Sequence, residues 1–357
     1  MHVPDGFINA PVSAVAGVVA AGAVALSLRG ARKELGGTPQ AGDLGGERLA
    51  PLAGLVAAFV FAVQMLNFPV AAGTSGHLLG GALAAILVGP WTGVLCIAVV
   101  LLMQGVLFAD GGLTALGVNI VVMGVVTVVV AHFLFRGLRA VLPRTRGGVT
   151  AASFVAALVS VPASAAAFTL LYAIGGTTDV PIGKVLTAML GVHVLIGIGE
   201  AAITALTVGA VLAVRPDLVY GARGLTAPLK LRVDGELVDA APAETEAPAA
   251  AGSPRKVWIG GVVTALVLAG VVSFYASASP DGLEKVAADQ GIDAKAEEYE
   301  HATADSPLAD YGVQGIDSAR LSGGLAGVIG VALTLAAGTG AFWAVRRRRA
   351  ADSGARL

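Results

Sequence analysis

The sequence predicts an all-α polytopic membrane protein, with a seven-segment helical bundle followed by a C-terminal module of two transmembrane helices. Of its 357 residues, 56% are hydrophobic and only 13% are charged, whereas soluble domains carry about 25% charged residues. Apolar runs of about 20 residues, long enough to cross a bilayer as a helix, recur along the chain. The single cysteine, Cys96, lies in one of these runs; it excludes an internal disulfide and is interpreted as a small packing residue.

The seven-segment bundle is predicted over residues 1–220, where Gly, Pro or Arg interrupts the apolar runs. The pair Gly89-Pro90 leaves the third segment short for a full crossing. A short segment is tolerated where protein, instead of lipid, surrounds it. The predicted segments are 8–28, 49–68, 77–88, 91–109, 113–135, 149–174 and 185–214.

Lys and Arg residues gather in three of the predicted loops, and cytoplasmic loops carry the excess of these residues. Placing loops 29–48, 136–148 and 215–256 inside puts the N-terminus, His77, Asp110 and Asp179 on the outer side. The outer segments carry almost no basic residues, Lys184 being the exception. We therefore expect a multi-pass protein of the bacterial plasma (inner) membrane, with its N-terminus outside and its C-terminus cytoplasmic.

The composition changes after the seventh segment. Residues 221–256 are polar and rich in Ala, Pro and Glu, which predicts a flexible cytoplasmic linker. Residues 257–349 form a second membrane module, with crossings predicted at 257–276 and 322–345 around an acidic outer loop. The four arginines at 346–349 are interpreted as a stop-transfer anchor and not as a nucleic-acid-binding patch.

The first seven residues, MHVPDGF, hold the donors of a metal chelate. The Met1 α-amine, the His2 amide nitrogen and the His2 imidazole can close two fused rings on one divalent ion. An all-nitrogen tetragonal site favours Ni(II) or Cu(II), and Co(II) is a softer alternative. Pro4 ends the donor run because it has no amide N–H, and Asp5-Gly6 is predicted to turn the tip back onto the protein. An ordinary frayed terminus is the competing interpretation.

The chelate needs a free amine on Met1 and a fourth nitrogen. Because His2 is bulky and no cleavable signal precedes the first apolar run, we expect Met1 to be retained. The chain has four other histidines. Among them, His77 follows Thr74-Ser75-Gly76 in a polar loop on the predicted outer face, so it is free to approach the N-terminus.

Three polar residues inside the predicted spans form a candidate intramembrane polar station, because polar groups there mark either packing partners or a pathway. His193 and Glu200 lie seven residues apart on one helix face. They are interpreted as a buried polar pair or as a second metal or proton station. Asn119 is uncharged, and hydrogen bonding between helices is its expected role. His132 is expected at the inner membrane interface.

The sequence contains no recognisable catalytic or nucleotide-binding motif. It has no Walker A sequence and no phosphate-binding strand-to-helix turn. It also has no HExxH, no GxSxG and no carboxylate pair placed for catalysis. We therefore predict a protein that is not an enzyme, with no catalytic residues and no catalytic cofactor, and any ATP hydrolysis in separate subunits.

Five stretches of the chain carry a family resemblance: MHVPDGF at 1–7, GHLLGG at 76–81, GGLTALGVN at 111–119, GVHVLIGIGE at 191–200 and PDGLE at 280–284. The first four resemble the signatures of CbiM/NikM, the substrate-binding membrane components of cobalt and nickel energy-coupling-factor (ECF) ABC transporters. The fifth resembles the PDGLE module, a NikN-type accessory component. The resemblance covers residues 1–220 and 257–345, so the chain looks like a fusion of the two.

The resemblance implies a ligand set, a substrate and partners. The ligands would be the Met1 amine, the His2 amide nitrogen, the His2 imidazole and the His77 imidazole, in a square-planar site at the outer face. The transported substrate would be Ni(II) or Co(II), and the fused module is more similar to the nickel branch. The partners would be a transmembrane coupling (T) subunit, two ATP-binding subunits and the lipid bilayer, with no nucleic acid. We expect the C-terminal module to help load the site from outside.

Two other classes of function remain open. A self-sufficient divalent cation channel or secondary carrier would use His193 and Glu200 as its relay. An intramembrane metalloenzyme would need a general base near His77, which the sequence does not provide. Neighbouring genes for an ATPase with Walker motifs and for a second membrane subunit would favour the importer over the carrier.

Overall fold

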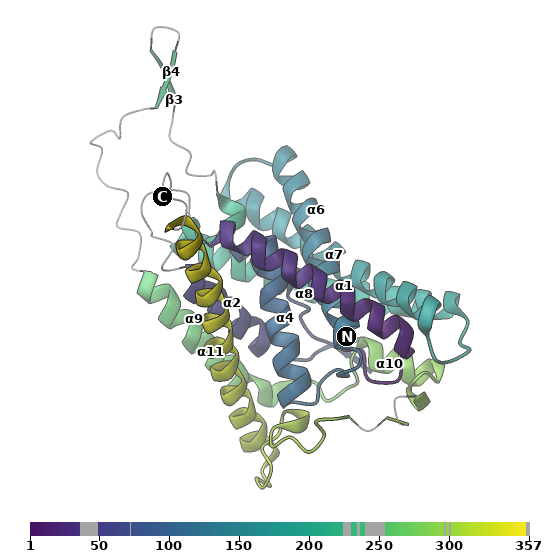
Figure 1. Ribbon diagram of the computed structural model, residues 1–357. Helices are drawn as coiled ribbons and strands as arrows, with labels where there is room; N and C mark the ends of the chain where they lie inside the picture. The colour runs from purple at the N-terminus through teal and green to yellow at the C-terminus, as the bar shows by residue number, and fades with distance from the viewer. Residues whose placement is uncertain are drawn as a thin grey trace.

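The computed structural model describes residues 1–35, 49–71, 73–223, 230–233, 236–239, 254–295, 298–299 and 301–354. Within these ranges, seven helices are long and apolar enough to cross a membrane, which confirms the predicted class of all-α polytopic membrane protein (Figure 1). They are α1 (Ala10–Glu34), α4 (Pro90–Leu107), the continuous run of α5 (Leu116–Asn119), η2 (Ile120–Val126) and α6 (Thr127–Val141), α7 (Arg146–Gly175), α8 (Ile182–Val214), α9 (Pro254–Gly270) and α11 (Ala319–Gly354).

Two further predicted segments are shorter helices, α2 (Leu49–Gln64) and α3 (Gly81–Val88). The eight residues of α3 rise only about 12 Å, against a hydrocarbon core of about 30 Å. All eight are buried in protein, as expected for a short segment. Gly89 separates α3 from α4 with a φ of 100°, and a Cβ there would lie 2.6 Å from the Glu34 carboxyl carbon. The turn therefore requires glycine.

The second predicted segment is wrong at its end. Helix α2 stops at Gln64, and the following residues form β1 (Phe68–Ala71), which pairs antiparallel with β2 (Thr74–Gly76). Pro69 cannot continue a helix interior but fits a short strand at a sheet edge. His77 follows directly after the second strand of this hairpin.

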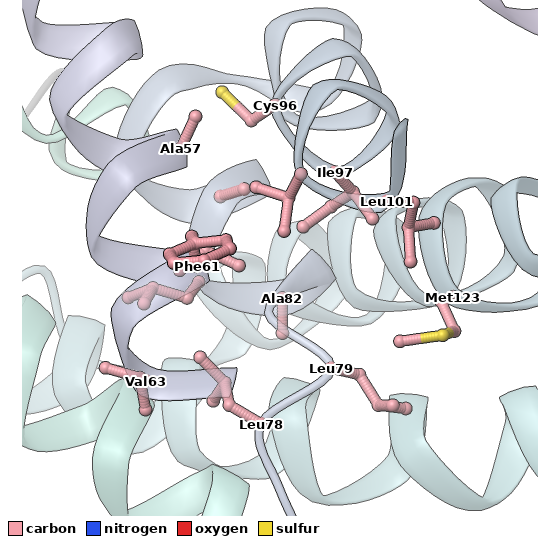
Figure 2. Close-up of a cluster of buried hydrophobic side chains, with 14 of the residues drawn as sticks. Ala57, Phe61, Val63, Leu78, Leu79, Ala82, Cys96, Ile97, Leu101 and Met123 are labelled. Atoms are coloured by element: carbon pink, nitrogen blue, oxygen red, sulfur yellow. The ribbon is translucent and has the colours of Figure 1, made fainter. Parts of the chain in front are cut away.

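The core of the protein lies where α2, α3 and α4 meet. Figure 2 shows Phe61, Ala82 and Ile97 gathered in one cluster of apolar side chains. Cys96 is fully buried beside it, and its thiol donates to the Ala53 carbonyl at 3.4 Å. The packing role predicted for Cys96 is confirmed.

The C-terminal module packs against the first domain through α9 and α11, both of which contact α2. Between these two helices, α10 (Gly282–Gln290) lies close to the start of the chain (Figure 1). From the sequence we expected an acidic loop in this region. The structure shows that part of it, α10, is helical. The predicted linker 221–256 lies mostly outside the described residues. Where it is described, β3 (Lys230–Val233) pairs antiparallel with β4 (Glu236–Asp239).

Candidate metal centre

The described chain begins in the interior of the protein. Met1 is 2% exposed and Val3 is fully buried. The Val3 amide donates to Asn119 Oδ1 at 2.8 Å, and Asn119 Nδ2 donates back to the Val3 carbonyl at 3.1 Å. Asn119 thus holds the N-terminal segment, at the point where α5 passes into the π-helical turn η2. Such turns are frequent at functional sites.

The predicted turn at Asp5-Gly6 is present, and it fixes the C-terminal end of the same N-terminal segment. The Thr114 amide donates to Asp5 Oδ1 at 2.8 Å, and the Gly112 amide donates to the Val3 carbonyl at 2.9 Å. A frayed terminus is therefore the wrong interpretation of these residues.

The N-terminal amine meets His77. The distance from the Met1 nitrogen to His77 Nε2 is 2.5 Å, although the residues are 76 positions apart. The His2 ring stacks on the His77 ring, with 5.0 Å between centroids and 15° between planes. The structure thus brings together the three residues predicted to supply the ligands.

The His77 ring is oriented by its own neighbourhood. Its Nδ1 lies 2.9 Å from the Leu78 carbonyl, which calls for a hydrogen on Nδ1 and leaves the Nε2 lone pair facing Met1. Glu200 anchors the next two residues, accepting hydrogen bonds from the amides of Leu79 at 2.6 Å and Gly80 at 3.2 Å. Anchors of this kind fix the direction of a metal-ligating histidine.

The His2 imidazole lies beside the amine but is held by other partners. Its Nδ1 is 3.1 Å from Asp110 Oδ1, and its Nε2 is 3.2 Å from Gln104 Oε1. Burial lowers the pKa of His2 from 6.5 to about 4, and the nearby Asp110 carboxylate acts in the opposite direction. The neutral form is the one that binds metal ions.

A carboxylate that the sequence did not assign to the site completes the cluster. Asp281, from the PDGLE stretch, is 7% exposed and accepts a hydrogen bond from the Met1 ammonium at 2.6 Å. Burial on its own raises the pKa of Asp281, but the adjacent Met1 ammonium acts in the opposite direction, and the pKa of this carboxyl lies well below its usual value.

Sequence reasoning missed Asp281, Asp110 and Gln104 as neighbours of the ligands. A signal existed for Asp281, because Asp followed three positions later by Glu284 is a capping box, which marks a helix start. The structure contains this box at the N-terminus of α10. Asp110 and Gln104 carry no comparable signal, since only the folded chain places them beside His2.

The proposed polar station is not a single unit. Glu200 accepts hydrogen bonds from the segment that follows His77, whereas Asn119 is hydrogen-bonded to the N-terminal segment. His193 Nδ1 lies 2.8 Å from the Met189 carbonyl, and among the described residues its buried Nε2 has no hydrogen-bond partner.

A cavity of about 590 Å³ adjoins the cluster. His2 and His77 line it together with one arginine, Arg320, and four carboxylates, those of Asp110, Asp281, Glu284 and Asp310. A cavity dominated by one sign of charge raises the local concentration of the opposite ion, so this one favours cations.

The sequence comparisons show which family the chain belongs to. The CbiM family model, described as the cobalt uptake substrate-specific transmembrane region, matches residues 2–218. This chain belongs to the CbiM family. The PDGLE domain matches residues 255–347, so the CbiM region carries a C-terminal PDGLE module, as the motifs indicated.

Similar proteins carry metal-transport names. A Haloquadratum walsbyi protein, provisionally named as a metal transport protein, is 39% identical over 220 residues, covering 62% of this chain and 94% of the relative. An Archaeoglobus fulgidus protein, provisionally named fused nickel transport protein NikMN, is 37% identical over 221 residues, covering 61% and 68%. A cobalt transport protein CbiM of Geobacter sulfurreducens is 34% identical over 226 residues, covering 61% of each.

The fold of the CbiM region is also similar to a solved structure. The crystal structure of a transition metal transporter covers 60% of this chain and 93% of its own, with 25% identity and a TM-score of 0.51. The chain is therefore a multi-pass membrane component of the cobalt and nickel transport family.

Proposed function

We propose that this chain is the substrate-specific membrane component of an ATP-driven Ni(II)/Co(II) importer, and that it binds the ion in a square-planar four-nitrogen site. The observation that carries the proposal is the 2.5 Å between the Met1 amine and His77 Nε2. With metal–nitrogen bonds of about 2.0 Å, as for zinc and imidazole, adjacent corners of a square lie about 2.8 Å apart. The two nitrogens are therefore close to chelating separation.

The remaining two donors in this proposal are the His2 amide nitrogen and the His2 imidazole. Among the described residues, no three His, Cys, Asp or Glu side chains are grouped to hold a metal ion. The proposed site uses two main-chain nitrogens beside the two imidazoles. To close the chelate, His2 exchanges its contacts with Asp110 and Gln104 for the ion.

The donor set favours Ni(II), because planar all-nitrogen coordination suits it. The name of the Archaeoglobus fulgidus relative refers to nickel and to a fused protein, whereas the Geobacter sulfurreducens name refers to cobalt. We propose Ni(II) as the preferred substrate and Co(II) as a second one.

We propose that the metal site faces outward and that the C-terminus is cytoplasmic. A second cavity, of about 460 Å³, supports this orientation because it is lined by four arginines of the predicted inner loops: Arg136, Arg139, Arg144 and Arg223. His132 lines the same cavity. Basic residues accumulate on the cytoplasmic side of membrane proteins, and the acidic cavity adjoins the metal site instead.

Release of the ion requires partners in this proposal. A dehydrated ion in a four-nitrogen site occupies a deep energy minimum, and the site opens only if another state is stabilised. The sequence offers no Walker motif, so a coupling (T) subunit and two ATP-binding subunits supply that input.

The experiment that tests the function compares Ni and Co accumulation in cells that express this chain alone or with the partner subunits. We expect rapid uptake only with the partners, and one tightly bound Ni(II) per purified chain without them. Rapid uptake by the chain alone would favour the channel or secondary carrier.

A further inference from the structure

The PDGLE stretch lies directly on the segment that carries His77. The Ser75 amide donates to the Pro280 carbonyl at 2.8 Å, and the Ser75 hydroxyl donates to the Ser279 carbonyl at 2.7 Å. Ser75 is fully buried and stands two residues before His77. The C-terminal module is thereby joined to the metal-binding segment by its main chain.

The same stretch packs closely against α8. A Cβ on Gly282 would lie 2.7 Å from Ile196 Cδ1 and 2.9 Å from Val192 Cγ1, so a larger residue at this position would displace these side chains of α8. Leu283 is 1% exposed. Two of the five motif residues thus serve to seat the segment.

The Asp281 carboxylate divides its oxygens between the helix and the metal site. Oδ1 accepts hydrogen bonds from the amides of Leu283 at 2.7 Å and Glu284 at 2.8 Å. The Glu284 carboxylate accepts a bond from the Asp281 amide at 2.8 Å and closes the capping box. Oδ2 is left for Met1, and it lies 2.6 Å from the amine and 3.5 Å from His77 Nε2.

We propose that Asp281 is a positioning residue of the metal site, and that the segment 280–284 is a clasp that holds the chelating N-terminus beside His77. The inference rests on the proposed function, because it takes Met1, His2 and His77 as the ligands. Ordering a chain terminus costs conformational entropy. A partner that orders the terminus before the ion arrives removes this cost from binding.

A positioning role fits the relatives better than a ligand role does. The Haloquadratum walsbyi protein has 94% of its length matched by 220 residues of this chain. The remainder leaves no room for a region as long as the PDGLE match at 255–347. In this relative the carboxylate is therefore not part of the same chain, whereas the four nitrogens proposed as ligands all lie in the CbiM region of this chain, and this difference favours a positioning role for Asp281. The expected role of the module in loading the site from outside stays a separate prediction.

The test measures Ni(II) affinity by competition with a chelator, using the full chain and its Asp281→Ala and Asp281→Asn variants. Outer-shell partners typically contribute about 10–100-fold in metal affinity, and we expect a loss in this range for Asp281→Ala. We expect a smaller loss for Asp281→Asn, because an amide oxygen still accepts from the amine. Asn is also a good N-cap residue, so this variant retains α10.

The matched control is Asp289→Asn, which removes a carboxylate from the same helix. Asp289 is exposed and pairs with Lys285, so we expect unchanged affinity. The visible absorption spectrum of bound Cu(II), used as a probe, reports the donor set; it should be the same in the Asp281 variants and the unmodified chain.

Three outcomes would overturn the inference. Unchanged affinity in Asp281→Ala would make its contact with Met1 incidental. An equal loss in Asp289→Asn would indicate a general effect of the helix. A changed Cu(II) spectrum would make Asp281 a ligand. The variant His77→Ala separates this inference from the proposed function: if it keeps full affinity, the ligand set itself is wrong.

Discussion

At the scale of single residues, His77 and Asp281 each have one polar atom free at the candidate site, because the other is already hydrogen-bonded. His77 Nδ1 is engaged by the Leu78 carbonyl, so only Nε2 is available to an ion. One oxygen of Asp281 caps α10, so only the other reaches Met1. Each group is therefore restricted to one function at the site.

His77→Ala should weaken Ni(II) binding by more than the roughly 10–100-fold expected for the loss of an outer-shell partner. The reason is that water would replace the fourth nitrogen. Isothermal titration of the purified chain measures the change in affinity. The control is His132→Ala, because His132 lines the other cavity among arginines. Equal losses in the two variants would show that His77 is not the fourth ligand.

The sequence predicted which three residues the structure brings together, because the chemistry that singles them out is local or rare. An amine, an amide and an imidazole at positions 1 and 2 form a chelate wherever the terminus lies, and only four other histidines could complete it. Asp110 and Gln104 could not be found in this way. Their contacts with His2 depend on where α4 ends relative to the N-terminal segment.

At the scale of elements, a buried carboxylate holds each end of the segment formed by α3. Glu200 accepts from the amides of Leu79 and Gly80 just before the helix. Glu34 accepts from the amides of Trp91 at 3.2 Å and Thr92 at 2.8 Å just after it. These contacts compensate for donors that a helix start leaves without intrahelical partners.

Glu200→Gln should therefore destabilise the protein without abolishing transport. The amide keeps one acceptor oxygen and leaves one main-chain donor unpaired, which costs about 1–3 kcal/mol. Thermal unfolding and Ni uptake per folded protein check this prediction. Glu34→Gln is the matched control, because it changes the carboxylate at the other end of the same segment. If Glu200→Gln alone eliminated uptake in the presence of the partner subunits, Glu200 would act as a relay and not as an anchor.

The long helices were predictable because an apolar run fixes their length and place, whatever packs around them. The small elements were not. Strands β1 and β2 are four and three residues long, and their pairing depends on a turn and on contacts with α8. Helix α10 is only nine residues long and mixes polar with apolar side chains, so its capping box is the feature that distinguishes it from a loop.

At the scale of the whole molecule, the two domains share one acidic cavity. Asp110 comes from the CbiM region, whereas Asp281, Glu284 and Asp310 come from the PDGLE region. The sequence predicted an acidic outer loop, and the structure shows three of its carboxylates beside the proposed metal site. The fusion therefore adds negative charge to this cavity.

Asp310→Asn should slow Ni uptake roughly two- to threefold at about 10 mM ionic strength and have little effect at about 150 mM. Salt shortens the range of electrostatic attraction from about 30 Å to about 8 Å between these conditions. Asp310 has a φ of 53°, which Asn also adopts. The control is Asp317→Asn, because Asp317 is exposed and does not line the cavity. A defect that is independent of salt would indicate a structural role for Asp310.

The central claim is that the ion binds to the free amine of Met1, and Ni(II) titration of two purified proteins tests it most directly. One is the full chain with its mass confirming a free Met1, and the other carries Gly-Ser-Gly-Ser before Met1, which removes the free amine without placing a histidine among the first three residues of the new terminus. The extension converts the amine into an amide within a buried site. We predict one Ni(II) bound per chain in the first protein and no tight binding in the second. Equally tight binding by the extended protein would contradict the account.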